Sequence, residues 1–457
     1  MNVTAARAMT AAMLAGDWNR RQVLQRLRNC LGRTGKGTAW PAKLVALLFG
    51  PTAFPERRPA AGELTDFLRM HPAARKVTAR AERGLLRWSA FARTADGAPA
   101  MWRLDHNAAW NVPSITTPAQ LCDVLELSAP HLDWLADCRG LERTAEGERL
   151  RNYRYTWVRK SSGGYRLLEV PKQRLKAAQR WIASSILNRI PAHDAAHAFV
   201  SGRSPVSAAR RHLSRDVVLR IDLKNFFPSI AAARVAGIFR SAGYPQRVVS
   251  LLTGLCTNCT WQSVIDLVPG DGIETAREQL RILTSPHLPQ GAPTSPALAN
   301  LCAYSLDVRL TGLAKKFDAF YTRYADDLVF SGGLEFRRRL QRFRIHVLAI
   351  AHNEGFEIRR RKTAVMKQDE CQRITGVVVN QRPNIDRRDY DRLKAILTNC
   401  VRYGLHAQNH SGHADFRSHL QGRVAHVRAV HPNRGAKLQA ILDRIPQVPN
   451  SATTTGK

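Results

Sequence analysis

The apolar positions of this chain include two short runs that are typical of buried strands. Residues 217–223 are almost all apolar and rich in β-branched side chains, which predicts a strand with Asp222 near its end. A second apolar run covers residues 328–330 and follows Asp326 and Asp327 directly. This order predicts a hairpin with two aspartates at its tip. Because segments with helical spacing surround these strands, we predict an α+β fold.

The part of the chain that precedes these strands is predicted to be mostly helical. Within residues 116–150, Pro118 occupies a first helical position and Ser128 an N-cap, which predicts two short helices. We expect this pair to pack as a helical lead-in, and a DNA-reading helix-turn-helix is the alternative. Residues 1–115 form a basic, mostly helical extension broken by Gly and Pro stretches. Gly35 precedes a lysine but lacks the earlier glycine of a phosphate-binding loop.

The C-terminal part is predicted to be helical and then unstructured. Within residues 379–445, apolar spacing predicts helices over 390–405 and 416–430, whose Arg and His side chains would contact a nucleic-acid backbone. Residues 446–457 contain few apolar side chains, which predicts disorder.

Three carboxylates, Asp222, Asp326 and Asp327, indicate metal-dependent chemistry. Nucleotidyl transfer deprotonates a hydroxyl while charge builds on a leaving pyrophosphate, and two Mg²⁺ ions about 3.5 to 4 Å apart stabilise both oxygens. Mg²⁺ prefers oxygen ligands, so aspartates held by strands suit it, and Mn²⁺ is the alternative ion. An Asp pair taken alone is more often a turn, and a single Asp an N-cap. The surrounding motifs therefore decide between the two interpretations.

The middle of the chain carries a series of motifs that together resemble a bacterial retron-type reverse transcriptase. They run in the family's order from about Tyr153 to about Asn380, roughly half of the chain. The resemblance implies a right-hand polymerase, with fingers and an antiparallel-sheet palm over 151–378 and a helical thumb over 379–445, and it makes the three aspartates catalytic and metal-binding. The matching blocks are residues 163–166 (GGYR), 170–172 (VPK), 175–181 (LKAAQRW), 196–204 (AHAFVSGRS), 222–230 (DLKNFFPSI), 288–296 (LPQGAPTSP), 322–328 (TRYADDL), 355–356 (GF), 362–363 (KT) and 372–380 (QRITGVVVN).

The resemblance assigns four residues to the incoming nucleotide. Arg166 and Lys172 lie on a hairpin predicted to turn at residues 161–164, where their charges would hold a triphosphate. Two solvated surface cations are the alternative interpretation. Gln290 and Gly291 would line the nucleotide pocket, because a glycine lets backbone approach a ligand closely.

Two further substrate contacts follow from the same resemblance. Phe227 matches the bulky aromatic that lies under the sugar, where a 2′-hydroxyl would clash, and this predicts a preference for deoxynucleotides. Core packing is the alternative, since Phe226 is adjacent and at most one of the two rings can face a pocket. Lys362 matches a lysine near the pyrophosphate and is a candidate general acid, although a basic run often forms only a solvated or phosphate-binding face.

Nucleic-acid contacts are implied at five more positions. Thr375 and Gly376 belong to a stretch predicted as a strand entering a hairpin, which in the family grips the primer. His212 is either structural or in contact with RNA. The complete set is Arg203, His212, Tyr324, Thr375 and Gly376.

Composition agrees with a nucleic-acid partner. The chain carries 70 Lys and Arg against 36 Asp and Glu, a formal net charge of +34, with a pI near 10.9. Such a balance favours binding to phosphates with an affinity that falls steeply with salt.

Only Cys256 and Cys259 form a CxxC, so neither zinc nor disulfides are predicted. No apolar stretch is long enough to span a membrane, and we expect a cytoplasmic protein with no membrane partner.

The function that these patterns favour is an RNA-directed DNA polymerase of a retron. It would copy part of a structured non-coding RNA into single-stranded DNA, prime from a 2′-hydroxyl, yield a branched RNA–DNA product and serve in antiphage defence. The expected partners are that RNA, the RNA–DNA product, dNTPs and an accessory effector protein. One alternative is a defence-associated reverse transcriptase outside the retrons, which Ala208 favours because retron enzymes usually carry Asn there. The other is an inactive RNA-binding protein on this fold, against which the three intact aspartates argue.

Overall fold

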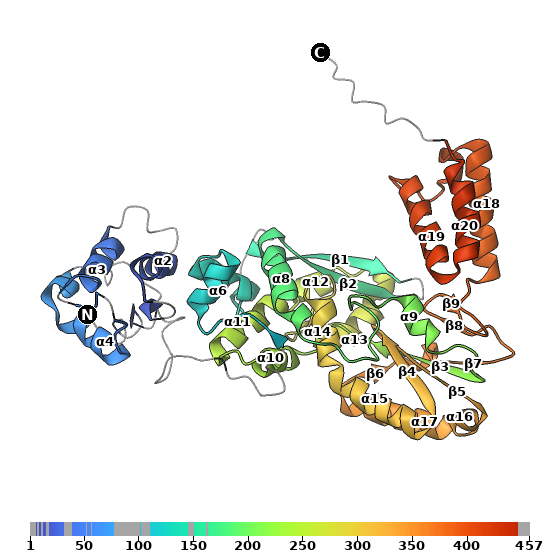
Figure 1. The fold of residues 1–457 in the computed structure, drawn as a ribbon, viewed down its shortest axis with the longest axis horizontal. Helices are drawn as coiled ribbons and strands as arrows, with labels where there is room; N and C mark the ends of the chain where they lie inside the picture. The colour runs from blue at the N-terminus through green and yellow to red at the C-terminus, as the bar shows by residue number, and fades with distance from the viewer. Residues whose placement is uncertain are drawn as a thin grey trace, which may run out of the picture. The chain divides into compact units, whose positions relative to one another are not determined.

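The computed structural model combines helices with antiparallel strand pairs (Figure 1), which confirms the α+β class. The chain divides into two compact units, residues 1–191 with 227–302 and residues 192–226 with 303–457. No helix in the described part of the chain has both the length and the apolar character needed to cross a bilayer. The structure describes residues 6, 9–10, 12–14, 18–31, 39–51, 53–55, 57–76, 101, 110–144, 150–160 and 163–446.

The first unit begins with a group of helices that share an apolar core. Their buried faces meet around Leu27, Leu44 and Leu64, none of which is exposed. The segment that contains Gly35 lies outside the described residues. The helices are α2 (Arg20–Leu31), α3 (Trp40–Leu48) and α4 (Ala61–Met70).

Two further helices, α6 (Pro118–Leu125) and α7 (Ala129–Ala136), confirm the predicted helical pair. The side chain of Thr117 caps α6 by accepting a backbone N–H at 3.2 Å. Ser128 stands at the N-cap of α7, but its hydroxyl lies 3.1 Å from Nδ1 of His131 and makes no side-chain capping bond to the backbone. Each helix therefore begins where the sequence predicts, but the N-cap side chain makes a different interaction in each.

The rest of the first unit contains a two-stranded hairpin and a series of helices. Strands β1 (Tyr153–Arg159) and β2 (Tyr165–Pro171) pair antiparallel, with Val158 opposite Arg166. Gly163 and Gly164 both adopt positive φ in the connecting loop, as the predicted turn requires. The remaining elements are η4 (Leu141–Thr144), α8 (Gln173–Ser185), η6 (Leu187–Arg189), α10 (Ala232–Ser241), α11 (Gln246–Cys256), α12 (Gln262–Ile265), η7 (Gly270–Gly272), α13 (Ile273–Leu283) and α14 (Ser295–Cys302).

A five-stranded antiparallel sheet forms the centre of the second unit. The order is β4-β5-β3-β6, and β7 also pairs with β3, so β3 is interior and buried along most of its length. Helices α15 and α17 lie along one face of this sheet (Figure 1). The elements are α9 (Pro205–Arg210), β3 (Val217–Lys224), α15 (Tyr304–Lys316), β4 (Ala319–Tyr324), β5 (Asp327–Gly332), α16 (Leu334–Arg338), α17 (Leu340–Asn353), β6 (Glu357–Ile358), η8 (Arg360–Lys362) and β7 (Ala364–Lys367).

The second unit ends in a small hairpin and three helices. Apolar side chains from these helices pack with Val218 of β3 and Val329 of β5 in one buried cluster. The helix predicted from residue 390 begins three residues earlier, the one predicted over 416–430 is confirmed, and the last helix was not predicted. The elements are β8 (Arg373–Ile374), β9 (Val377–Val378), α18 (Arg387–Tyr403), η9 (His406–Gln408), α19 (Phe416–Val430) and α20 (Pro432–Asp443).

Candidate active site

Strand pairing brings the three predicted carboxylates together in the second unit. Asp222 of β3 lies directly opposite Asp327 of β5 in the antiparallel ladder. Directly opposed residues project from the same face of a sheet, so both carboxylates share one face. Asp326 belongs to the loop that precedes β5, and its carbonyl accepts the N–H of Leu223 at 2.9 Å. The predicted strand and the hairpin with aspartates at its tip are therefore confirmed.

The hairpin that carries Asp326 has a two-residue loop. Tyr324 pairs with Asp327, which leaves Ala325 and Asp326 as the connection between β4 and β5. Ala325 has a φ of 55°, the positive value that primed hairpin turns require at their first loop position. Glycine is usual at such a position because a Cβ is strained there. Ala325 therefore adopts a backbone conformation that is strained for a residue with a Cβ.

Burial and mutual repulsion act on these carboxylates. Burial, followed by the negative charges of Asp327 and Asp222, raises the pKa of Asp326 above its ordinary value. Burial also raises the pKa of Asp327, although the Arg220 charge and hydrogen bond oppose that rise. A cation that approached this face would relieve the repulsion among these carboxylates.

Three side chains already supply positive charge at this face. Lys362 Nζ lies 3.3 Å from Asp222 Oδ1, which puts this residue beside the carboxylates, and its contact with the pyrophosphate stays a prediction. Arg359 Nε lies 3.7 Å from Asp222 Oδ2, and Arg220 Nε lies 3.0 Å from Asp327 Oδ1. The sequence analysis missed both arginines. Alternation along β3 was the signal for Arg220, which precedes Asp222 by two residues and shares its face.

The three carboxylates offer the oxygen ligands that a divalent cation prefers, and one of these oxygens has no hydrogen-bond partner. Asp222 Oδ2 is buried and has no hydrogen-bond partner. Arg359 approaches this oxygen to 3.7 Å without a hydrogen bond, so the lone pairs of the oxygen remain available to a divalent cation. No group of three or more His, Cys, Asp and Glu among the residues that the structure describes is gathered as a ready metal cage. Metal binding by the three aspartates therefore stays a prediction.

A buried ion pair supports the hairpin from within the protein. The guanidinium of Arg323 donates to both carboxylate oxygens of Asp307, at 2.8 and 2.7 Å, and neither side chain is exposed. A further N–H of Arg323 donates to the carbonyl of Ala325 at 3.2 Å, and the hydroxyl of Tyr321 donates to Asp307 at 2.8 Å. The pair thus connects helix α15 to the loop that holds Asp326. The sequence analysis did not single out either member.

The structure does not present His212 to nucleic acid. Its side chain is fully buried, and its two ring nitrogens lie 2.7 Å from the hydroxyl of Ser331 and 2.8 Å from that of Thr322. Burial, followed by the charge of His197, lowers the pKa of His212 to about 3, so the ring is neutral. This environment fits the structural role that was also considered for His212, because the buried ring is not accessible to RNA in this structure.

The other residues predicted to bind nucleic acid occupy loops and strand ends of the second unit. Arg203 Nη1 donates to the carbonyls of three loop residues between 193 and 196, and Nη2 forms an ion pair with Asp194 at 3.1 Å, which gives it a structural role. Thr375 and Gly376, both with positive φ, form the two-residue turn of the β8–β9 hairpin. Tyr324 is half-buried at the end of β4. Nucleic-acid contacts at these positions stay predictions.

Four predicted nucleotide contacts of the first unit lie on strand β2, just after it, or in the loop beside it. Arg166 is exposed on β2, and Lys172 follows that strand at the N-cap of α8. The carbonyl of Gln290 accepts the N–H of Glu169 at 2.9 Å. Gly291 has a φ of +133°, and a Cβ there would lie 3.0 Å from the Glu169 carbonyl oxygen, so only glycine fits without adjustment. The loop at 290–291 and the strand that carries Arg166 are thus adjacent.

The neighbouring phenylalanines Phe226 and Phe227 have different environments. Phe226 is buried, with its ring centroid 5.7 Å from that of Phe356 and 5.6 Å from the Arg323 guanidinium. Phe227 is half-buried. Phe226 is therefore the core residue of the pair, and contact of Phe227 with the sugar stays a prediction.

A buried polar network behind β2 was not anticipated from the sequence. The carboxylate of Glu169 lies 2.9 Å from His287 Nε2 and accepts hydrogen bonds from Asn258 at 2.8 Å and Thr260 at 2.7 Å. Burial alone would raise the pKa of Glu169, but the His287 charge and these bonds lower it. The same carboxylate raises the pKa of His287 in spite of burial. Each group therefore favours the charged form of the other.

Comparison with known proteins matches the part of the chain that contains this sheet and hairpin to a known family. Residues 158–379 match the family model described as "Reverse transcriptase (RNA-dependent DNA polymerase)". The chain is 40% identical over 292 residues to the Retron Mx65 reverse transcriptase of Myxococcus xanthus, and 36% identical over 297 residues to the Retron Mx162 reverse transcriptase of the same organism. It is 31% identical over 246 residues to the Retron Ec86 reverse transcriptase of Escherichia coli.

The extent of these matches defines the family. The match to Retron Mx65 covers 64% of this chain and 64% of the relative, and that to Retron Mx162 covers 63% and 58%. The chain thus spans less than two thirds of the length of these two relatives. The match to Retron Ec86 covers 53% of this chain and 68% of the relative. The chain contains a reverse transcriptase domain, and it belongs to the retron reverse transcriptase family.

Proposed function

We propose that this protein is an RNA-directed DNA polymerase that synthesises the DNA of a retron. The observation that carries the proposal is the register of β3 and β5, which sets Asp222 opposite Asp327 and beside the loop of Asp326. That arrangement occurs in a chain that belongs to the retron reverse transcriptase family. The architecture would be that of a right hand, with β1 and β2 in the fingers, the five-stranded sheet as the palm and α18 to α20 in the thumb.

In this proposal the three aspartates hold two divalent ions, Mg²⁺ or alternatively Mn²⁺. When bound, such ions lower the pKa of the attacking hydroxyl and neutralise charge on the leaving pyrophosphate. Lys362 stands 3.3 Å from Asp222 in the structure and would move onto the pyrophosphate, where it could donate a proton. Arg220 would keep Asp327 ionised and fixed by their 3.0 Å ion pair.

The nucleotide would be held from β2 and the loop beside it. Arg166 and Lys172 would contact the triphosphate, while Gln290 and Gly291 would form the wall of the pocket. Phe227 would lie under the sugar and exclude a 2′-hydroxyl. The close approach of Gly291 to β2 supports a shared site for these residues, because it fixes the 290–291 loop beside the strand of Arg166.

The template is proposed to be a structured non-coding RNA that also supplies the priming 2′-hydroxyl. The product would be branched RNA–DNA, made in the cytoplasm, with a role in antiphage defence alongside an accessory effector. The net charge of +34 supports a polyanionic partner.

The test is to express the chain with its native flanking DNA, with Asp326→Asn as the matched inactive variant. A debranching-sensitive RNA–DNA band from wild type but not from the variant is the expected result.

A DNA product without a branch would instead support a defence-associated reverse transcriptase outside the retrons. One observation favours that second candidate: position 208, where retron enzymes usually carry Asn, is a buried alanine in α9. Equal RNA recovery from both proteins, with DNA from neither, would indicate an RNA-binding protein.

A further inference from the structure

A small cavity adjoins the central sheet of the second unit on the face away from the carboxylates. It has a volume of about 260 Å³, and one of its walls is Ile221 of β3. Side chains alternate along a strand, so Ile221 and its neighbour Asp222 project to opposite faces. The cavity is therefore separate from the candidate active site, although the η8 turn borders both: Lys362 approaches Asp222 while Arg360 lines the cavity.

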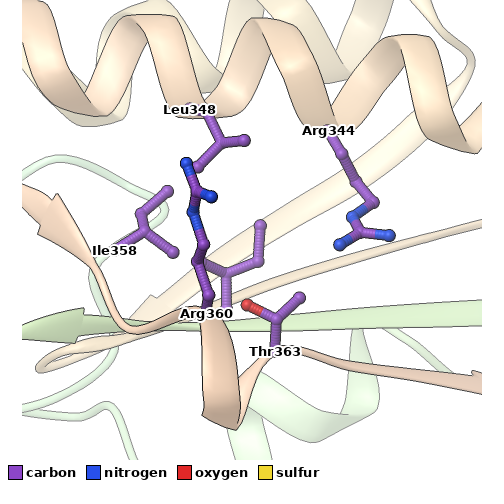
Figure 2. Close-up of a pocket in the computed structure, with 6 residues that line it drawn as sticks. Arg344, Leu348, Ile358, Arg360 and Thr363 are labelled. Carbon is purple, nitrogen blue, oxygen red and sulfur yellow. The ribbon is translucent and has the colours of Figure 1, made fainter.

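The lining combines apolar walls with two cations from different elements. Ile221, Leu348 and Ile358 supply the apolar surface. Figure 2 shows Arg344 extending from helix α17 toward Thr363, and Arg360 extending from the η8 turn toward Leu348. A flat apolar ring would fit between such walls, and a guanidinium can stack on a ring or bind a phosphate.

The charges around this cavity lack a matching carboxylate. No acidic residue lines it, and neither Arg344 nor Arg360 forms an ion pair within the described residues. Arg344 donates instead to the neutral side chain of Gln341 at 3.3 Å. Two like charges converging on one cavity favour an anionic occupant. Arg361, next to Arg360 in the same turn, is exposed and adds positive charge nearby.

We propose that this cavity binds one unpaired nucleotide of an RNA strand, with the base between the apolar walls and the adjoining phosphate on Arg344 and Arg360. The inference rests on the proposed function, which supplies a partly single-stranded RNA partner. Proteins recognise unpaired bases in this way, by apolar contact, Arg stacking and charge contacts to the backbone. A cavity of about 260 Å³ suits one base better than a larger ligand.

The test uses the full chain and a 12-nucleotide oligouridylate that carries 4-thiouridine as a photocrosslinker. Crosslinked peptides are mapped by mass spectrometry, and we expect them to come from residues 344–363. Leu348→Trp fills the cavity without changing charge, and Arg344→Ala removes one cation. Each should reduce this crosslink by about tenfold or more, the effect of losing one stacked base. Arg344→Ala, at a half-buried position, decides the outcome if Leu348→Trp does not fold.

Arg342→Ala is the matched control. Arg342 is exposed on the same helix and does not line the cavity, so its loss removes the same charge with less than about a twofold effect. An equal loss of crosslink in Arg342→Ala and Arg344→Ala would overturn the proposal. So would a crosslink that maps elsewhere, or one that Leu348→Trp leaves unchanged.

Competition experiments distinguish an RNA strand from a free nucleotide or a simple polyanion as the occupant of the cavity. An abasic oligonucleotide of equal length and polyglutamate should each compete at least about tenfold more weakly than unmodified oligouridylate, because they lack the base. Equal competition by either would show a plain basic surface. Equal competition by uridine monophosphate would assign the cavity to a free nucleotide and overturn the RNA-strand assignment.

Primer extension by the wild-type chain is measured in parallel. Extension of an RNA-templated primer without the expected crosslink would overturn this inference and leave the proposed function standing. The expected crosslink without extension would contradict the polymerase proposal while supporting the RNA site.

Discussion

Arg323 and Asp307 form a bidentate ion pair that is excluded from solvent, with N–O distances of 2.8 and 2.7 Å. The same guanidinium donates to the carbonyl of Ala325 at 3.2 Å, one residue before Asp326. Burial opposes the charge of Arg323, but Asp307 more than compensates and raises its pKa. Because the hydrogen bond to Ala325 fixes the loop, Arg323 is a positioning residue for the candidate catalytic carboxylate.

Replacing Asp307 should destabilise the second unit strongly. Asp307→Asn would leave a buried guanidinium without its counter-charge, which costs about 3 to 5 kcal/mol. The measurement is urea denaturation of the full chain, monitored by far-UV circular dichroism, because no tryptophan lies in the second unit. Glu335→Gln is the control, because its ion pair with Arg338 is exposed and should contribute less than about 1 kcal/mol. Equal effects of the two substitutions would contradict a special role for the buried pair.

Arg323→Lys tests positioning separately from charge. Lysine keeps the positive charge but lacks the planar fork that reaches Asp307 and Ala325 together. We expect kcat of primer extension to fall about 10- to 100-fold with little change in KM for dNTP, because a displaced Asp326 impairs the chemical step more than binding. A parallel rise in KM with kcat unchanged would instead place Arg323 in nucleotide binding.

Asp326→Asn should abolish synthesis and stabilise the metal-free fold. Loss of one charged ligand costs several kcal/mol of transition-state stabilisation, about a 10³-fold fall in rate. A carboxylate whose pKa is raised on folding destabilises the fold at every pH above its ordinary value of 3.8, and an amide removes that penalty. The measurements are primer extension and the thermal midpoint in EDTA. A lower midpoint for the variant would contradict the repulsion inferred among Asp222, Asp326 and Asp327.

The Glu169–His287 pair should make the stability of the first unit depend on pH. The lowered pKa of Glu169 gives stability that is full above its ordinary value of 4.5 and is lost as pH falls through the lowered value. The raised pKa of His287 gives stability that is full below its ordinary value of 6.5 and is lost as pH rises through the raised value. Denaturation midpoints across this range should fall at both ends in wild type. Glu169→Gln should abolish the fall in denaturation midpoint at alkaline pH, and it should lower the free energy of unfolding by about 3 to 5 kcal/mol.

Substitutions at Ala325 should separate loop strain from loop chemistry. Ala325→Gly relieves a positive φ of 55° and should stabilise the chain by up to about 1 kcal/mol, whereas Ala325→Val should destabilise it by more than that. Denaturation midpoints measure both effects. Ala407→Val, at an exposed position outside the positive-φ residues, is the control for the added side-chain bulk.

The parts of the site that the sequence predicted are those with local signals. An apolar, β-branched run identified β3, and Asp326 and Asp327 followed by a second such run identified the hairpin, so the meeting of these aspartates with Asp222 could be anticipated. Lys362 was predicted near the pyrophosphate through the family motif alone, and nothing in a basic run indicates which cation reaches Asp222.

The parts that the sequence did not predict depend on pairings between distant polar residues. His287 lies 118 residues from Glu169, and neither apolar periodicity nor propensity indicates which buried charges will pair. His212 shows the same limit, because a histidine beside two arginines resembles a nucleic-acid contact until its two hydroxyl partners are known. Tertiary structure decides whether such a group is solvated or buried.

The two adjacent phenylalanines give a matched test of the predicted sugar contact. Phe227→Ala should admit ribonucleotides, lowering the ratio of kcat/KM for dNTP over NTP by about tenfold or more, because the side chain that clashes with a 2′-hydroxyl is removed. Phe226→Ala should leave that ratio unchanged and instead cost about 3 to 5 kcal/mol of stability, since its ring is buried against Phe356. Single-nucleotide extension with each nucleotide and urea denaturation measure the two effects. If Phe226→Ala relaxed sugar selection while Phe227→Ala only destabilised the fold, the assignment of Phe227 would be wrong, and the pocket would lie on the other side of the strand end.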